Sequence, residues 1–161
     1  MTPDRIPVVI LCGGEGTRFR EETQYRPKPL IEIGSEPVLL HIMRHYSDYG
    51  FRRFILCLGY RGIMIKEFFL NHELRLRDMR FELSTGAHSF LNSGPQLDWE
   101  IVFAETGDKT QTGARIARIA RYVDTPCFMA TYGDGVSDVD LEACSRSTWR
   151  TVRSGPSPRS R

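Results

Sequence analysis

The sequence of 161 residues predicts an α/β fold, in which helices cover both faces of a mainly parallel sheet. Short apolar, β-branched runs alternate with segments whose apolar residues recur at helical spacing. Glycines directly follow the first and the last of these runs, at 13–14 and at 133–135. Because the carboxyl ends of parallel strands share one edge of a sheet, we expect these two glycine-rich segments to lie close together.

Local patterns predict the individual elements in order. Strands are expected at residues 6–12, 54–58, 99–104 and 127–132, with a further short strand at 79–83. Helices are expected at residues 38–49, 63–70 and 112–123. Ser35, followed by an acidic residue and a proline, has the residue types of a helix start. Gly50 is expected to end that helix.

The chain divides into a folded part, residues 1–143, and a tail, residues 144–161. The tail contains five arginines and no acidic residue, so the first 143 residues carry a net charge of −3 (17 basic against 20 acidic). Its Arg/Ser/Pro composition without periodicity predicts disorder. Basic residues confined to a tail indicate nucleic-acid binding only weakly. An α/β unit is expected to continue with more strands after its last loop, so the chain looks truncated.

Composition excludes several classes of protein. No apolar run approaches the length of about 20 residues that spans a membrane, and residues 8–11 are too short for a signal peptide, so we expect a cytoplasmic protein. Three cysteines lie in or beside apolar runs and are interpreted as small buried hydrophobes: Cys12, Cys57 and Cys127. The four histidines lack the spacing of metal ligands, and no Ser/His/Asp arrangement is indicated: His41, His45, His72 and His88.

The strongest functional signal follows the first strand. It consists of eight consecutive residues: Leu11, Cys12, Gly13, Gly14, Glu15, Gly16, Thr17 and Arg18. Glycines after a strand let consecutive backbone amides surround an anion, and Thr17 and Arg18 add donors suited to phosphate. A dinucleotide fingerprint would need glycine in place of Phe19, and a P-loop would need a lysine. A plain glycine-rich turn remains the alternative interpretation.

Two further charged residues complete the predicted phosphate site. Lys28 stands between Pro27 and Pro29, which hold the backbone extended and present a fixed positive charge. Asp134 stands between glycines at the end of the last strand, where a carboxylate can hold Mg²⁺ together with substrate phosphates. A surface lysine and a hairpin turn are the respective alternatives. The polar segment 106–115, before a helix, suits a contact to a base or ribose.

These motifs resemble the signature of the sugar-phosphate nucleotidyltransferases. The resemblance covers residues 6–143, is most similar to the glucose-1-phosphate cytidylyltransferases, and implies a Rossmann-like nucleotidyltransferase fold. The matching segments are 11–18, Pro27-Lys28-Pro29, Glu32-Ile33-Gly34, Glu21-Glu22-Thr23, His41-Ile42-Met43, Gly59-Tyr60, Ile65-Lys66-Glu67, Thr106-Gly107-Asp108, Thr112-Gly113 and Thr131-Tyr132-Gly133-Asp134-Gly135.

The resemblance implies a Mg²⁺-dependent transfer from CTP to glucose 1-phosphate, which yields CDP-glucose and pyrophosphate. It assigns residues 11–18 and Gly133 to the nucleotide, with Arg18 also at the departing pyrophosphate. Lys28 would neutralise charge at the attacked phosphorus and Asp134 would bind Mg²⁺, so these two and Arg18 form the implied catalytic set. Lys109 and Ala114 would contact the nucleotide. No membrane partner is implied, and a homo-oligomer fits the family.

The sequence also departs from the family pattern. Cys12 stands where alanine is usual, Lys109 replaces a small polar residue, and Ala114 replaces a glycine. The family continues into a second half that supplies a lysine for the sugar phosphate, most of the sugar pocket and a second magnesium-binding aspartate. We therefore expect the activity to be impaired by truncation, with the tail a frameshift product. A non-catalytic nucleotide-binding fragment or pseudoenzyme is the alternative.

Overall fold

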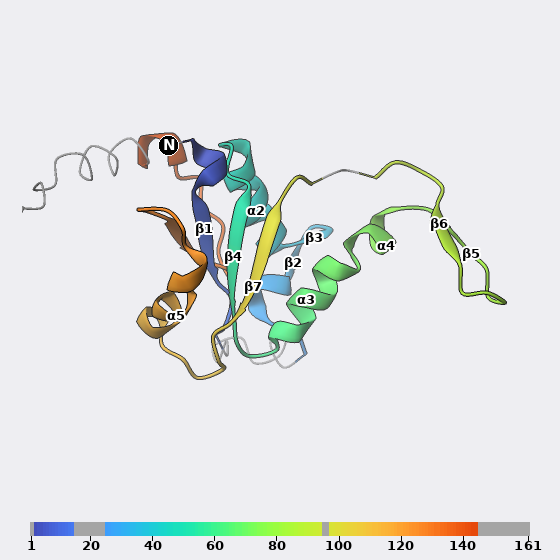
Figure 1. Cartoon of the computed structure of the whole chain (residues 1–161), viewed down its shortest axis with the longest axis horizontal. Coiled ribbons are helices and arrows are strands. Elements are labelled where there is room, and N and C mark those ends of the chain that lie inside the picture. The colour runs from blue at the N-terminus through green and yellow to red at the C-terminus, as the bar shows by residue number, and fades with distance from the viewer. Residues whose placement is uncertain (1, 15–24, 95–96, 145–161) are drawn as a thin grey trace, which may run out of the picture.

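A four-stranded parallel sheet forms the centre of the computed structural model, which describes residues 2–14, 25–94 and 97–144 (Figure 1). The strands lie in the order β7-β4-β1-β8, and every neighbouring pair is parallel. Their bounds are β1 (Pro7–Leu11), β4 (Arg53–Leu58), β7 (Glu100–Glu105) and β8 (Met129–Tyr132). The predicted parallel sheet is confirmed.

Helices cover both faces of this sheet, as the sequence predicts. Helices α2 (Val38–Asp48) and α3 (Gly62–Leu70) pack with Val8 and Ile10 on one face. Helix α5 (Thr112–Ile119) packs with Val9 on the opposite face. Strand β1 is apolar throughout because neighbouring side chains point to opposite faces and both faces are buried.

Shorter elements complete the described chain. They are η1 (Pro3–Arg5), η2 (Lys28–Leu30), the hairpin β2 (Glu32–Ile33) and β3 (Glu36–Pro37), α4 (His72–Leu76), the hairpin β5 (Met79–Phe81) and β6 (His88–Phe90), and η3 (Ala120–Tyr122). None of the helices within the described ranges is both long and apolar enough to cross a membrane. The predicted tail lies outside the described residues from position 145 onward.

One predicted helix start is wrong. Ser35 lies in the turn between β2 and β3, and α2 begins at Val38, after Pro37, without a side-chain cap. Gly34 adopts a φ of 68°, which favours glycine and supports a tight turn between β2 and β3. Because Ser35 belongs to this turn, it does not cap the helix. The predicted end of α2 is confirmed, because Gly50 follows it with a φ of 89°.

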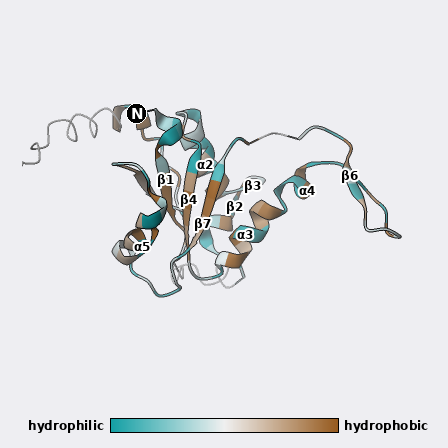
Figure 2. Ribbon diagram, viewed as in Figure 1, coloured by the Kyte–Doolittle hydropathy of each residue, from teal (hydrophilic) through white to brown (hydrophobic). Residues whose placement is uncertain are grey.

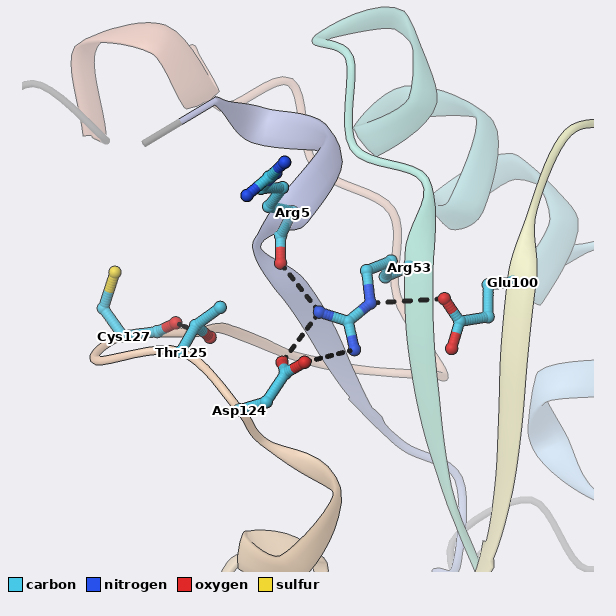
Figure 3. Close-up of polar contacts among 6 residues, drawn as sticks. All are labelled: Arg5, Arg53, Glu100, Asp124, Thr125 and Cys127. Atoms are coloured by element: carbon cyan, nitrogen blue, oxygen red, sulfur yellow. Dashed lines mark hydrogen bonds and ion pairs between the residues drawn. The ribbon is translucent and has the colours of Figure 1, made fainter.

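Arg53 ties together the amino-terminal edge of the sheet (Figure 3). Its Nη1 donates to the carbonyl of Arg5 at 3.0 Å and to Oδ1 of Asp124 at 2.8 Å. Its Nε donates to Oε2 of Glu100 at 3.3 Å. Hydrogen bonds from this guanidinium lower the pKa of Asp124 below its ordinary value of 3.8. The contacts connect η1, β7 and the segment before β8 to β4.

We expect Asp124→Asn to lower the free energy of unfolding at neutral pH. The pKa of the Asp124 carboxyl is lower in the folded state than its ordinary value of 3.8. The carboxylate therefore makes its full contribution to the unfolding free energy above pH 3.8, and this contribution is lost as the pH falls through the folded-state pKa. Urea unfolding of both proteins at pH 7 and near pH 3 measures this difference. The exposed Asp138 provides a charge-matched control, Asp138→Asn. A difference of the same size at both pH values would contradict the assignment.

Candidate functional site

A cavity of about 370 Å³ opens at the carboxyl edge of the sheet. It is bounded by the ends of β1 and β8, by η2, and by the segment that leads into α5. Its lining residues are Leu11, Cys12, Gly13, Gly14, Lys28, Pro29, Asp108, Lys109, Thr110, Thr112, Arg115, Tyr132 and Asp134. The two glycine-rich segments therefore meet at one edge, as the order of the strands requires.

The ends of β1 and β8 are held close together. The amide of Gly133 donates to the carbonyl of Leu11 at 3.0 Å. On the other side of β1, the amide of Cys12 donates to the carbonyl of Cys57 in β4 at 3.0 Å. A Cβ at Gly133 would lie 3.0 Å from the Sγ of Cys12 and 3.2 Å from the oxygen of Leu11. A glycine at 133 is thus required for this close approach of the two strand ends.

Lys28 and Asp134 lie next to each other at the cavity, although 106 positions separate them in the chain. The Nζ of Lys28 is 3.3 Å from Oδ2 of Asp134, and their side chains are 22% and 43% exposed. Pro27 is extended, and Pro29 is buried. Together these prolines fix the direction in which the ammonium group is presented.

Arg115 forms the floor of the cavity; it belongs to the polar segment 106–115, but the sequence predicts no role of its own for it. Arg115 is only 5% exposed. Its Nη1 donates to the carbonyl of Leu58 at 3.0 Å and to Oγ1 of Thr106 at 2.6 Å. Its Nη2 donates to the carbonyls of Gly13 at 2.8 Å and Asp108 at 3.0 Å. All four acceptors are neutral, so the charge of the guanidinium adds a positive potential to the cavity.

One signal in the sequence points to Arg115. Arg115 and Ile119 are four positions apart, and both are buried residues of α5. An arginine on the apolar side of an amphipathic helix is directed toward the protein interior. The neighbouring Ala114, predicted to contact the nucleotide, is exposed on the first turn of α5 and does not line the cavity.

The other predicted site residues are placed as follows. Seven of them line the cavity: Leu11, Cys12, Gly13, Gly14, Lys28, Lys109 and Asp134. Gly133 is buried and does not itself line the cavity. Four lie outside the described residues: Glu15, Gly16, Thr17 and Arg18.

The cysteines near the cavity are suited to packing and not to chemistry. Burial raises the pKa of the Cys12 thiol far above its ordinary value and that of Cys57 to about 11. Both thiols therefore stay protonated at neutral pH, and a protonated thiol is a poor nucleophile. Cys127 is half-buried and Cys144 is exposed.

We expect Gly13→Ala to disturb the cavity floor and Gly14→Ala to leave it intact. A Cβ at Gly13 would lie 2.1 Å from the Nη1 of Arg115, whereas a Cβ at Gly14 meets nothing within 4 Å. Displacement of this buried guanidinium is expected to cost about 1–3 kcal/mol of unfolding free energy. Urea unfolding of the two variants measures the contrast, and equal effects would contradict it.

The comparison with protein families finds a match over most of the chain. The model of the MobA-like NTP transferase domain matches residues 8–135, which includes both glycine-rich segments. The glucose-1-phosphate cytidylyltransferase of Salmonella typhimurium is 45% identical over 136 residues, which are 84% of this chain and 52% of that protein. The probable glucose-1-phosphate cytidylyltransferase of Bacillus subtilis is 46% identical over 133 residues, which are 83% of this chain and 52% of that protein.

Solved structures share the fold. HddC from Yersinia pseudotuberculosis, complexed with GMP-PN, has a TM-score of 0.62 and 23% identity, covering 89% of this chain and 54% of its own. The UTP-bound UGPase from Acinetobacter baumannii has a TM-score of 0.61 and 16% identity, and the match covers 96% of this chain and 54% of the UGPase chain. The chain thus spans about half the length of the relatives it matches. It belongs to the family of MobA-like NTP transferase domains, as its resemblance to sugar-phosphate nucleotidyltransferases predicts.

Proposed function

We propose that this cavity binds CTP and that the chain takes part in cytidylyl transfer to glucose 1-phosphate. The observation that carries the proposal is the proximity of Lys28 and Asp134, 3.3 Å apart, in a cavity that the buried guanidinium of Arg115 also lines. A triphosphate needs cationic donors, and its metal ion needs a carboxylate. Both are present on one side of the same cavity.

The chain's own groups would position and neutralise the triphosphate. Lys28 offers a charge held in place by two prolines, and Arg115 adds a second charge from beneath Gly13. Lys109 also lines the cavity and belongs to the segment before α5. Charges arranged before the substrate binds need little reorganisation during the reaction, which is the main source of catalysis in phosphoryl and nucleotidyl transfer.

The donor set at Asp134 fits Mg²⁺. Magnesium is commonly held by one or two carboxylates together with substrate phosphates and waters. No group of three or more His, Cys, Asp or Glu side chains in the described part of the chain is arranged to hold a metal ion, so the phosphates would have to supply further ligands. When bound, Mg²⁺ would neutralise charge on the triphosphate, and Asp134 would anchor it at the end of β8.

The proposed reaction needs no covalent intermediate. A phosphate oxygen of glucose 1-phosphate attacks the α-phosphorus of CTP, and the bond between that phosphorus and the bridging oxygen to the β-phosphorus breaks. CDP-glucose forms, and pyrophosphate leaves with the electron pair. Because the attacking phosphate is already an anion near neutral pH, no general base is required. The chain contributes position and charge.

The choice of CTP and glucose 1-phosphate follows the relatives. Those at 45% and 46% identity are named glucose-1-phosphate cytidylyltransferases, while HddC and the UGPase, structures below 25% identity, were determined with other nucleotides. Sequence similarity therefore favours CTP. We expect the protein to act in the cytoplasm, where nucleoside triphosphates and sugar phosphates are available.

A second candidate function is nucleotide binding without turnover. The observation that favours it is the coverage of 52% of the cytidylyltransferase relatives. The cavity described here contains groups for a triphosphate, whereas sugar-binding groups in such relatives can also come from the part that this chain does not match. In this case CTP would bind and no CDP-glucose would form.

A pyrophosphate-release assay tests the proposal. The protein is incubated with Mg²⁺ and each of the four nucleoside triphosphates, with and without glucose 1-phosphate, and CTP binding is measured in parallel by calorimetry. Pyrophosphate and CDP-glucose from CTP and glucose 1-phosphate would support transferase activity. Binding of CTP without product would support the second candidate, and the absence of both would overturn the proposal.

A further inference from the structure

Two histidines of α2 form hydrogen bonds with the two segments that carry Lys28 and Asp134. The Nε2 of His41 donates to the carbonyl of Ile33 at 3.1 Å, and the Nε2 of His45 donates to the carbonyl of Val139 at 3.1 Å. A carbonyl can only accept a hydrogen bond, so each Nε2 carries the hydrogen. His41 and His45 are one helical turn apart and therefore share a face of α2.

The first of these segments, residues 28–36, presents Lys28 and contains η2 and the turn between β2 and β3. The amide of Ile31 donates to the carbonyl of Lys28 at 3.0 Å, and the carbonyl of Ile31 accepts from the first amide of α2 at 2.9 Å. Residues 32–35 are exposed. The hydrogen bond from His41 therefore anchors the exposed part of the first segment on α2.

The second segment, residues 133–140, presents Asp134 and leads away from β8. Its first amide donates to the carbonyl at the end of β1, and Leu141, which follows the segment, is buried in the core. Between these two points residues 134–140 are exposed. The hydrogen bond from His45 therefore anchors on α2 a stretch that lies outside the core.

Packing is incomplete where the two segments meet α2. Figure 2 shows hydrophobic stretches in the central strands β1 and β4, which contribute to the core. Beside α2, by contrast, a cavity of about 280 Å³ is lined by Ile33 of the first segment, by Gly135 and Val136 of the second, and by both histidines. Groups that line a cavity lose part of their dispersion contacts. Directional hydrogen bonds therefore matter more for the position of the backbone here.

The positions of the two segments set the geometry of the two charges. The Nζ of Lys28 lies 3.3 Å from Oδ2 of Asp134, although each is presented by a different segment. A misplacement of about 1 Å in a site that orients reacting groups can cost about 100-fold in rate. A single helix face that holds both segments keeps the lysine and the carboxylate in register with each other.

We propose that His41 and His45 are positioning residues of the nucleotide site, an inference that rests on the proposed function. His41 holds the segment that presents Lys28 to the triphosphate, and His45 holds the segment that presents Asp134 to Mg²⁺. Neither histidine lines the cavity that contains Lys28 and Asp134. Each therefore acts through the backbone carbonyl that it binds.

Phenylalanine variants of the full chain test the two roles separately, because phenylalanine removes the donor and keeps a ring. The ring of His45 packs edge-on against Tyr46 and Tyr49, and a phenyl ring can keep these contacts. CTP affinity is measured by calorimetry with Mg²⁺ and with EDTA. His45→Phe is expected to reduce the tightening by Mg²⁺ from about tenfold or more to less than about threefold, with an unchanged affinity in EDTA.

His41→Phe is expected to show the opposite pattern. It weakens CTP binding by about threefold or more both in EDTA and in Mg²⁺, because it loosens the segment of Lys28, and it keeps the gain from Mg²⁺. His41→Gln and His45→Gln restore an N–H donor of similar reach and are expected to return to within about twofold of wild type. His88→Phe, at an exposed position of β6, is the control and is expected to match wild type.

NMR relaxation tests the anchors without any ligand. Backbone order parameters are expected to fall at residues 135–139 in His45→Phe and at residues 32–36 in His41→Phe, with the other segment unchanged in each variant. Unchanged order parameters would overturn the proposal. So would the same pattern of CTP affinities in both phenylalanine variants, or glutamine variants as weak as these. A wild type that binds no CTP would overturn the proposed function, and the order parameters would then decide the anchoring alone.

Discussion

Replacing Arg115 with methionine is expected to lower the free energy of unfolding by about 1–4 kcal/mol. The change leaves the carbonyls of Gly13 and Asp108 without the donor that now serves them. The unsatisfied buried carbonyl of Gly13 costs about 1–3 kcal/mol, and that of Asp108 costs less because Asp108 is exposed. The carbonyl of Leu58 is less affected, because the hydroxyl of Thr106 also donates to it at 2.6 Å. Urea unfolding with the linear extrapolation method measures the loss.

The same substitution is expected to weaken CTP binding at least about tenfold, because it removes a charge and a support of the glycine-rich segment. Calorimetric titration with CTP and Mg²⁺ measures this loss. Arg121→Met is the matched control, since Arg121 is exposed on η3 and stacks on the ring of Tyr122. Its unfolding free energy is expected to change by less than about 0.5 kcal/mol. Equal stability and equal CTP affinity in Arg115→Met and wild type would refute the assigned role.

Lys28→Met is expected to reduce the affinity for CTP by about 10- to 100-fold while changing stability little. A hydrogen bond between a fixed ammonium and a phosphate contributes about 1.5–3 kcal/mol. By contrast, the ion pair with Asp134 is partly exposed, and such pairs contribute about 0–1 kcal/mol to folding. The substitution therefore separates binding from stability. Parallel measurements of calorimetric affinity and urea unfolding show whether it does.

Lys66→Met is a suitable control for Lys28→Met. The Nζ of Lys66 lies 2.5 Å from Oε1 of Glu105, and its side chain is 29% exposed, close to the 22% of Lys28. Lys66 belongs to α3 and does not line the cavity. Loss of this charge is expected to leave CTP affinity within about twofold of wild type. A similar loss of affinity in both variants would show that general charge, and not the site, attracts the nucleotide.

The sequence predicts the two central strands well because they are buried on both faces. Residues 54–58 and 6–12 are apolar runs followed directly by glycines, and they form the central parallel strands β4 and β1. The two small hairpins are harder to predict. Strands β2 and β3 have two residues each, and β6 contains the polar residues His88 and Ser89. Periodicity over two or three residues does not distinguish a strand from a loop.

The candidate site also contains residues whose proximity the sequence predicts and one residue, Arg115, whose buried position it does not. Gly13, Lys28 and Asp134 could be predicted to meet, because parallel strands end at a common edge and prolines fix the lysine. The buried position of Arg115 depends on acceptors contributed by three separate segments, which only the folded chain brings together. Arginine is mostly exposed in proteins, so its place four residues before Ile119 on the helix is a weak signal for burial compared with its residue type.

The dependence of CTP binding on Mg²⁺ tests the central claim most directly. Calorimetric titrations of wild type and Asp134→Asn with CTP, each with Mg²⁺ and with EDTA, compare the four affinities. We predict that Mg²⁺ tightens binding to the wild type by about tenfold or more and that this gain is lost in Asp134→Asn. No binding of CTP by the wild type, or the same gain from Mg²⁺ in both proteins, would contradict the account.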